Sequence, residues 1–125
     1  MKKIIKTKLA PEAVGPYSQA VDTGSQLFVS GQIPIDPETS TMVEGDVEKQ
    51  TMQVMKNLKN IIEAAGYSMS DVVKCTCLLS DISDFKLFNS VYADFFKYDP
   101  PARATFQVAA LPLGALVEVD AIAVK

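Results

Sequence analysis

The segment between Asp46 and Gly66 constrains the fold of this chain more than any other part of its sequence. Its apolar side chains recur three and four positions apart, which is the spacing of one face of an α-helix. Asp46 suits the cap of the first turn, and Gly66 suits the end of the helix. We therefore predict an amphipathic helix that ends near Ala65, and its buried face needs a second layer to cover it. The positions on that face are Val47, Thr51, Val54, Met55, Leu58, Ile61, Ile62 and Ala65.

Short extended segments surround this helix and predict a sheet. A second helix is expected after Ser83 or Asp84, and Pro100-Pro101 ends it. Two helices and about six strands in 125 residues predict one domain over residues 1–125. Its fold class is α+β, with two layers and both helices on one face of a six-stranded mixed sheet. The expected strands are residues 3–6, 18–22, 27–31, 72–79, 102–110 and 115–124, with a hairpin turn at 23–26 and a loop at 34–45.

The last two expected strands carry polar residues at alternate positions. If they pair about a turn near residue 113, Arg103 and Glu118 lie roughly 15 Å apart, too far for contact within one subunit. In that register Thr105, Gln107 and Asp120 share their face, and Ala104, Phe106 and Val119 are among the residues that face the helices. Ala109, Ile122 and Val124 also lie on the polar face. Because these side chains are apolar, we expect that face to be partly buried against another copy in a closed oligomer.

Arg103 is the only arginine among 12 basic residues, and the chain has no histidine. The missing histidine removes the usual general base of a catalytic triad and the commonest transition-metal ligand. A guanidinium suits a two-pronged hold on a carboxylate or phosphate. A structural ion pair at an interface explains a lone arginine equally well.

Composition excludes several classes of protein. The net charge of −3 and the pI near 4.8 argue against nucleic-acid binding, which needs a concentrated basic surface. No run approaches the roughly 20 apolar residues of a membrane span, and no signal peptide follows Met1, so we expect a cytoplasmic protein. Cys75 and Cys77 would share one face of a strand, where we expect them to be reduced and packed rather than ligands of a metal.

Several separated motifs together are similar to those of a known family. The segment Pro101–Leu111 (PARATFQVAAL), followed by Val117-Glu118-Val119, resembles the C-terminal signature of the Rid family, the RidA/YjgF-like reactive intermediate deaminases. Val14–Ala20 (VGPYSQA) and Leu27–Ile33 (LFVSGQI) resemble its two N-terminal motifs. Gln50–Gly66 and Asn89–Tyr92 match between them. The resemblance therefore covers essentially the whole chain.

The resemblance implies a fold, an assembly and an activity. The fold would be similar to chorismate mutase, assembled as a homotrimer with a cleft between each pair of subunits. The activity would be hydrolytic deamination of 2-imino acids and enamines, such as 2-aminoacrylate, 2-iminopropanoate and 2-iminobutanoate, to 2-keto acids and ammonia. Neither a cofactor nor a metal is implied, and the partners would be the small ligand and other copies of the chain.

The resemblance also implies roles for particular residues. Arg103 corresponds to the arginine that binds the substrate carboxylate, and Glu118 to the glutamate near the attacking water. Many members have cysteine where this chain has Thr105, so the range of substrates stays open. An iminium is already electrophilic, so orientation and one acid–base group suffice without histidine. The residues expected to contact substrate are Tyr17, Ser30, Gly31, Asn89 and Thr105.

Two other functions remain open at this stage. One is a non-catalytic trimer that binds small carboxylates in the same pocket and regulates a partner. The other is RNA cleavage or inhibition of translation, an activity also associated with the family. The acidic balance, the lone arginine and the absence of histidine weigh against the RNA activity, although Lys2, Lys3, Lys6 and Lys8 could form a local basic patch.

Overall fold

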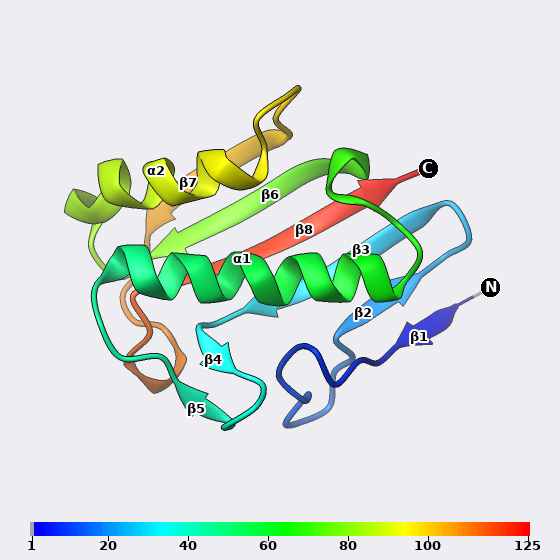
Figure 1. Cartoon of the computed structure of the whole chain (residues 1–125), viewed down its shortest axis with the longest axis horizontal. Coiled ribbons are helices and arrows are strands. Elements are labelled where there is room, and N and C mark those ends of the chain that lie inside the picture. Colours follow the sequence, from blue (N-terminus) through cyan, green and yellow to red (C-terminus); the bar gives the residue numbers. More distant parts are fainter. Residues whose placement is uncertain (1) are drawn as a thin grey trace.

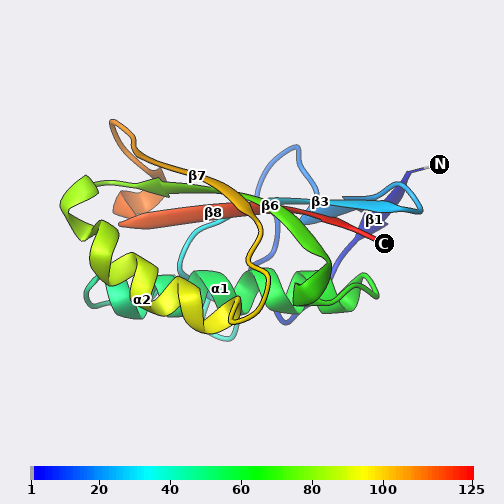
Figure 2. The same cartoon turned by 90° about the horizontal axis from the view of Figure 1, so that it is seen from above.

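The computed structural model describes residues 2–125 and has two layers. Six strands form a mixed sheet in the order β1-β2-β3-β8-β6-β7, and Figure 2 shows both helices on one side of it. Only β6 and β7 pair in parallel, and the other neighbours are antiparallel. The predicted α+β class is confirmed. The elements are β1 (Lys3–Ile5), β2 (Ala20–Asp22), β3 (Gln26–Gln32), β4 (Ile35–Asp36), β5 (Thr41–Met42), α1 (Val47–Ala64), β6 (Val72–Leu79), α2 (Phe85–Phe95), β7 (Ala102–Gln107) and β8 (Val117–Val124).

The local signals that predicted α1 act as expected. The Asp46 carboxylate accepts a hydrogen bond from the Lys49 backbone N–H at 3.0 Å, which satisfies a donor of the first turn. Gly66 follows the helix with φ of +83°, a conformation that glycine adopts without a steric penalty. The helix therefore begins and ends where the sequence indicates (Figure 1).

The core lies between the helices and the sheet. Leu58, Ile61 and Ile62 of α1 are fully buried there, as is Val119 of β8. Cys75 and Cys77 are also buried on β6, and both are free thiols, as predicted. Burial, which disfavours the thiolate, raises the pKa of the Cys75 thiol to about 11 and that of the Cys77 thiol to about 12. These cysteines therefore act as packing residues.

The predicted hairpin of the last two strands is wrong. β8 pairs with β3 on one side and β6 on the other, whereas β7 lies at the edge, parallel to β6. One whole face of β8 is buried, from Val117 to Ala123, which suits the middle of a sheet, whereas β7 is largely half-exposed. The predicted loop at 34–45 is also incomplete, because β4 and β5 form a small separate hairpin within it.

The expected common face for Arg103, Thr105, Glu118 and Asp120 is wrong as well. Arg103 is in register with buried Cys75, and Thr105 with buried Cys77, so both side chains lie on the helix side. Ala104 and Phe106 therefore lie on the opposite side, contrary to the prediction. Alternation along a strand shows which residues of that strand share a face, but it does not show which face meets the helices. An edge strand can present an arginine to the helix layer when aromatic rings of that layer cover the guanidinium.

Within residues 2–125, no helix covers the sheet face opposite α1 and α2, here called the open face. Phe28 and Phe106 are 43% and 48% exposed there. Ile122, which is in register with Phe28, shares this face with Glu118 and Asp120. The open face thus mixes apolar and acidic side chains, and its burial against another copy stays a prediction.

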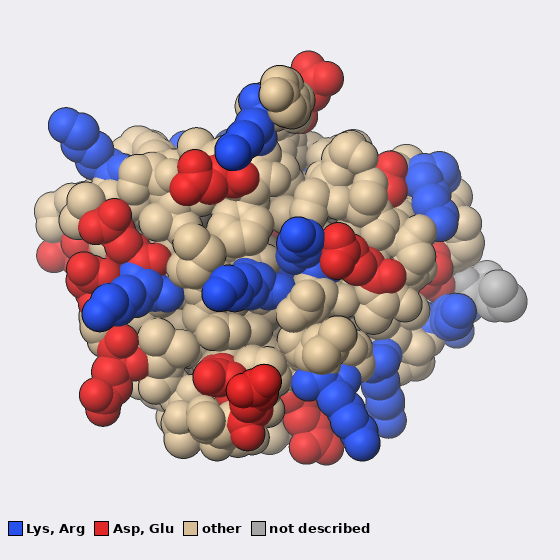
Figure 3. Space-filling view, in the orientation of Figure 1, with Lys and Arg blue, Asp and Glu red and all other residues tan. Residues whose placement is uncertain are grey.

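Charge on the helix-bearing face is dispersed. Figure 3 shows lysines and acidic residues interspersed over α1 and α2, rather than one broad basic surface. Among residues 2–125, no helix is long and apolar enough to cross a membrane.

The Asn57 amide joins α1 to the segment that follows β3, and this contact is open to test. It is fully buried and donates to the carbonyl oxygens of Ile33 at 3.3 Å and Ile35 at 2.9 Å. Asn57→Leu should lower the free energy of unfolding by about 2 kcal/mol or more, because it leaves these acceptors unpaired. Denaturant unfolding measures this. Asn60→Leu, which removes one exposed bond to Leu9, should cost less than about 1 kcal/mol; equal losses would contradict the account.

Candidate functional site

Arg103 extends from the edge strand β7 toward α2 and lies among aromatic rings. Its guanidinium carbon is 4.9 Å from the ring centroid of Tyr92, 5.5 Å from that of Phe85 and 5.9 Å from that of Phe88. These rings recur along one face of α2, and a cation over an aromatic face is stabilised by the ring quadrupole. The aromatic face of α2 therefore holds the only guanidinium of the chain.

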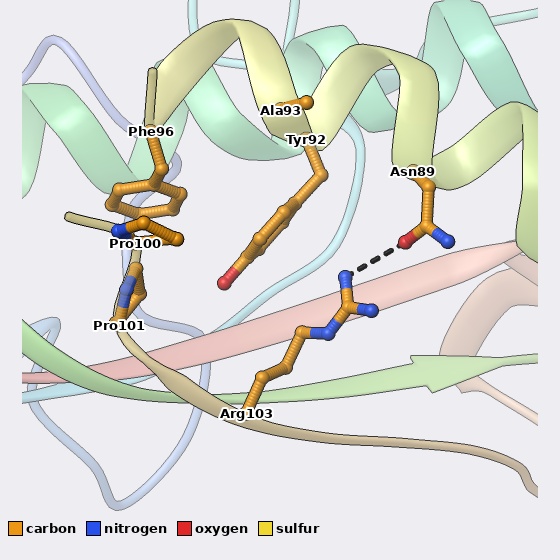
Figure 4. Close-up of a pocket in the computed structure, with 7 residues that line it drawn as sticks. All are labelled: Asn89, Tyr92, Ala93, Phe96, Pro100, Pro101 and Arg103. Atoms are coloured by element: carbon orange, nitrogen blue, oxygen red, sulfur yellow. Dashed lines mark hydrogen bonds between the residues drawn. The ribbon is translucent and has the colours of Figure 1, made fainter. Parts of the chain in front are cut away.

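The hydrogen-bond partner of Arg103 is neutral. Its Nη1 donates to the side-chain oxygen of Asn89 at 2.8 Å, as the dashed line in Figure 4 marks. A guanidinium has five N–H donors, so this bond fixes its orientation and leaves most donors available. The group faces a cleft of about 350 Å³, here called the Arg103 cleft. The cleft is lined by Asn89, Tyr92, Ala93, Phe96, Pro100, Pro101 and Arg103.

Two buried hydroxyl groups lie in the layer beside Arg103. Thr105 Oγ1 and Tyr92 Oη have no hydrogen-bond partner among residues 2–125. Burial and the neighbouring Cys75 thiol raise the pKa of Tyr92, which stays protonated. Both oxygens are buried within this chain, and each hydroxyl lies beside a thiol: Cys77 is next to Thr105, and Cys75 is next to Tyr92.

Glu118 occupies a different place, on the open face of β8. It lies beside a bulge in β3, where Ser30 and Gly31 together oppose the single residue Asp120. A Cβ atom on residue 31 would collide with the Glu118 carboxylate. The bulge and the missing side chain therefore allow this carboxylate to lie directly against the backbone of β3.

The surroundings of Glu118 favour its protonated form. Burial raises the pKa of the Glu118 carboxyl, and the negative charge of Asp120 raises it further. A carboxyl group with a raised pKa exchanges protons more readily near neutral pH, which suits a general acid or base.

Glu118 faces a cleft of about 420 Å³, here called the Glu118 cleft. Tyr17, 49% exposed, lines it together with Gly31. Ser30 does not line this cleft: its hydroxyl donates to the Ser18 carbonyl at 2.6 Å and lies in the adjoining hollow of the open face with Asp120. Ser30 thus supports the segment that carries Tyr17.

The expected site residues therefore form two groups. Arg103, Asn89 and Thr105 lie on the helix side, whereas Glu118, Gly31 and Tyr17 lie around the Glu118 cleft. In the observed register β8 lies two strands away from β7, and Glu118 lies three residues along β8 from the position level with Arg103. The Cα atoms of Arg103 and Glu118 are therefore about 14 Å apart, and the sheet lies between their side chains. One copy does not bring the two charged groups together.

Sequence reasoning missed two features of these clefts. One is the aromatic support of Arg103 by Phe85, Phe88 and Tyr92, although their spacing on a helix was a visible signal. The other is Leu113, which lines the Glu118 cleft and which no motif distinguished. Within residues 2–125, no group of three or more potential ligands could hold a metal ion.

The contact between Gly31 and Glu118 yields a direct test. Gly31→Ala should push the carboxylate toward solvent and lower the pKa of Glu118 toward its ordinary value, as an NMR titration would record. The backbone of Gly31 is not in the left-handed region, so alanine should change the unfolding free energy by less than about 1 kcal/mol. An unchanged pKa in a folded variant would show that this contact does not position Glu118.

This chain is similar to known proteins along its whole length. Residues 7–125 match the family model described as endoribonuclease L-PSP. A RutC family protein of Pyrococcus horikoshii is 51% identical over 100% of this chain and 99% of its own length. Human 2-iminobutanoate/2-iminopropanoate deaminase is 45% identical over 100% of this chain and 91% of its own. A crystal structure of a Rid family protein of unknown function from Yersinia pestis superposes with a TM-score of 0.97, at 48% identity over 100% of both chains.

Proposed function

This chain belongs to the Rid family of endoribonuclease L-PSP-type proteins, and from that premise we propose that it hydrolyses 2-imino acids and their enamines. The substrates would be small, such as 2-aminoacrylate, 2-iminopropanoate and 2-iminobutanoate, and the products 2-keto acids and ammonia. The observation that carries the proposal is the lone Arg103, held by neutral groups and facing a cleft. Because the hydrogen-bond partner of Arg103 is a neutral amide, the positive charge of the guanidinium is available to an anionic ligand.

The proposed reaction needs one anchor and one acid–base group. Arg103 binds the substrate carboxylate, and Asn89 fixes the orientation of the guanidinium. Glu118 accepts a proton from a water molecule as its oxygen attacks the imine carbon. The same proton then passes to the nitrogen. The C–N bond breaks as the C=O bond forms, and the hydroxyl proton passes back to Glu118, so that ammonia and the 2-keto acid leave. Because the iminium carbon is electrophilic, holding the substrate near this water provides most of the acceleration.

We propose that each site is built from two copies of the chain. Arg103 and Glu118 lie on opposite sides of one sheet, so a substrate can meet both only across a subunit boundary. The exposed apolar residues of the open face, Phe28 and Phe106, support burial against another copy. A closed homotrimer meets both requirements. Thr105 and Tyr17 would contact the substrate from the two sides of the boundary.

Two other functions compete with this one. A trimer that only binds small carboxylates would use Arg103 in the same way, but it would not need the raised pKa of Glu118. RNA cleavage has less support, because the charges of the helix-bearing face are mixed and the chain has no histidine. The single-domain organisation and the cytoplasmic location remain predictions from the sequence.

The proposal is tested by supplying the unstable substrate enzymatically. A pyridoxal-phosphate threonine dehydratase generates 2-iminobutanoate, whose decay is followed with and without this protein. The native chain should accelerate the decay, and Glu118→Gln should reduce kcat by roughly 100-fold or more. Arg103→Lys keeps the charge but loses the planar fork, so KM should rise. No acceleration by a correctly assembled native sample would support the binding module instead.

The pH dependence of the reaction follows from the pKa of Glu118. A general base works only when deprotonated, so kcat/KM should fall as the pH drops through a pKa above the ordinary value of 4.5. Asp120→Asn removes the neighbouring negative charge, lowers the pKa of Glu118, and should move this acidic limb to lower pH. The amide oxygen can still accept the bond from the Thr76 N–H. If the acidic limb of the pH profile does not move in Asp120→Asn, a group other than Glu118 causes it.

A further inference from the structure

Buried carboxamide side chains are gathered around the Glu118 cleft. Burying a polar group is unfavourable unless it is hydrogen-bonded, so each of these side chains meets a need that an apolar residue would not meet. Every one of them forms its hydrogen bonds with backbone groups. The buried carboxamides within residues 2–125 are Gln19, Gln32, Gln50 and Asn57.

These side chains bond to the segments that form the walls of the cleft. Gln19 lies behind the N-terminal wall, where its Nε2 donates to the Pro11 carbonyl at 2.8 Å. Gln32 donates to the Ser30 carbonyl at 3.1 Å and so spans Gly31 at the bulge of β3. Each wall therefore has at least one buried amide bonded to its backbone. The three walls lie within residues 11–17, 31–35 and 112–118.

Gln50 of α1 holds the segment that leads into β8. Its side-chain oxygen accepts a hydrogen bond from the Leu116 backbone N–H at 2.8 Å, and Leu116 lies two residues before Glu118. Its Nε2 donates to the Val43 carbonyl at 3.3 Å, just after the hairpin β4–β5, which lies beside the N-terminal half of α1 (Figure 1). Gln50 thus fixes the start of the strand that carries Glu118.

Asn57, two turns further along α1, holds the segment that leaves β3. Its amide donates to the Ile33 carbonyl, directly after the strand, at 3.3 Å. Gln53 donates to Asn57 Oδ1 at 2.8 Å, which fixes the orientation of that amide. Gln50 and Asn57 share one side of the helix and lie about 10 Å apart along its axis. One helix therefore holds the ends of both strands that meet at the Glu118 carboxylate.

The environment of the Glu118 carboxyl depends on this geometry. The carboxylate lies directly against the backbone of Gly31. The titratable groups around it are Asp120 of β8 and, on the N-terminal wall, Glu12 and Tyr17. A shift of either strand end would let water reach the carboxylate and would move it relative to the reacting carbon.

We propose that Gln50 and Asn57 are positioning residues for the acid–base step, which act on Glu118 through the backbone segments they hold. The inference rests on the proposed function and adds two residues that do not line the Glu118 cleft. Arg103 lies on β7, outside the segments that Gln50 and Asn57 hold. The two amides therefore affect proton transfer rather than binding of the carboxylate.

The test compares two substitutions of Gln50 in the assembled protein. Gln50→Met keeps the length of the side chain but removes both hydrogen bonds, so kcat for 2-iminobutanoate should fall about tenfold while KM changes less than about twofold. Gln50→Glu keeps an oxygen that accepts the Leu116 N–H, so its kcat should stay within about threefold of native. Native kcat in a folded Gln50→Met protein would overturn the proposal, as would an equal loss in both variants.

A carbon-13 NMR titration measures the pKa of Glu118, whose signal is identified by its absence in Glu118→Gln. In Gln50→Met this pKa should fall toward its ordinary value of 4.5, because water reaches the carboxylate. The control Ile62→Ala removes fully buried atoms near the C-terminal end of α1 and should lower stability at least as much. It should leave kcat and this pKa unchanged. A similar loss of kcat in the control would reduce the effect of Gln50 to general stability and overturn the proposal.

Two further results separate the possible failures. If the native protein does not hydrolyse 2-iminobutanoate, the proposed function fails, and the titration alone tests the positioning: a lowered pKa of Glu118 in Gln50→Met supports it, and an unchanged one overturns it. If Gln50→Met does not fold, Gln32→Met takes its place, since it removes only the bond to the Ser30 carbonyl. The pKa of Glu118 should fall there too, and an unchanged value counts against the proposal.

Discussion

The central place of β8 in the sheet determines where both halves of the candidate site lie. Its helix-side residues, from Val117 to Ala123, fill the core, so the alternate residues Glu118 and Asp120 have to lie on the open face. Pairing of β8 with β3 and β6 leaves β7 at the edge, beside α2. Arg103 consequently meets the aromatic face of α2, on the other side of the sheet from Glu118. The separation of the two charged groups is thus a consequence of core packing.

This separation gives each group a distinct environment. Arg103 is surrounded by aromatic rings and a neutral amide, which orient it without neutralising its charge. Glu118 lies partly buried beside a second carboxylate, which raises its pKa. If the two met within one chain, each would shift the other toward its charged form, and an ion pair would form. Within one chain, therefore, Arg103 and Glu118 do not neutralise each other.

Much of the fold could be predicted from local signals, because they act over a few residues. The helical spacing with Asp46 and Gly66 located α1, and the apolar run from Val72 to Leu79 located β6. Strand order is different, since it depends on which apolar faces pack best in three dimensions. Alternation along β7 was correct in period but wrong in phase, because the rings of α2 make the helix side acceptable to Arg103. The resemblance proposed a set of site residues, but it did not indicate that one chain divides them between two faces of the sheet.

The central claim is that one site uses Arg103 from one copy and Glu118 from another, and subunit mixing tests it most directly. Arg103→Ala and Glu118→Ala would each be purified, unfolded together and refolded, and imine hydrolysis would be compared with that of the separately refolded variants. The account predicts that each variant alone is inactive and that the mixture regains activity, because some subunit boundaries then join two intact halves. Native mass spectrometry would verify that mixed assemblies have formed. If these mixed assemblies remain inactive, the claim of a site shared between two copies is contradicted.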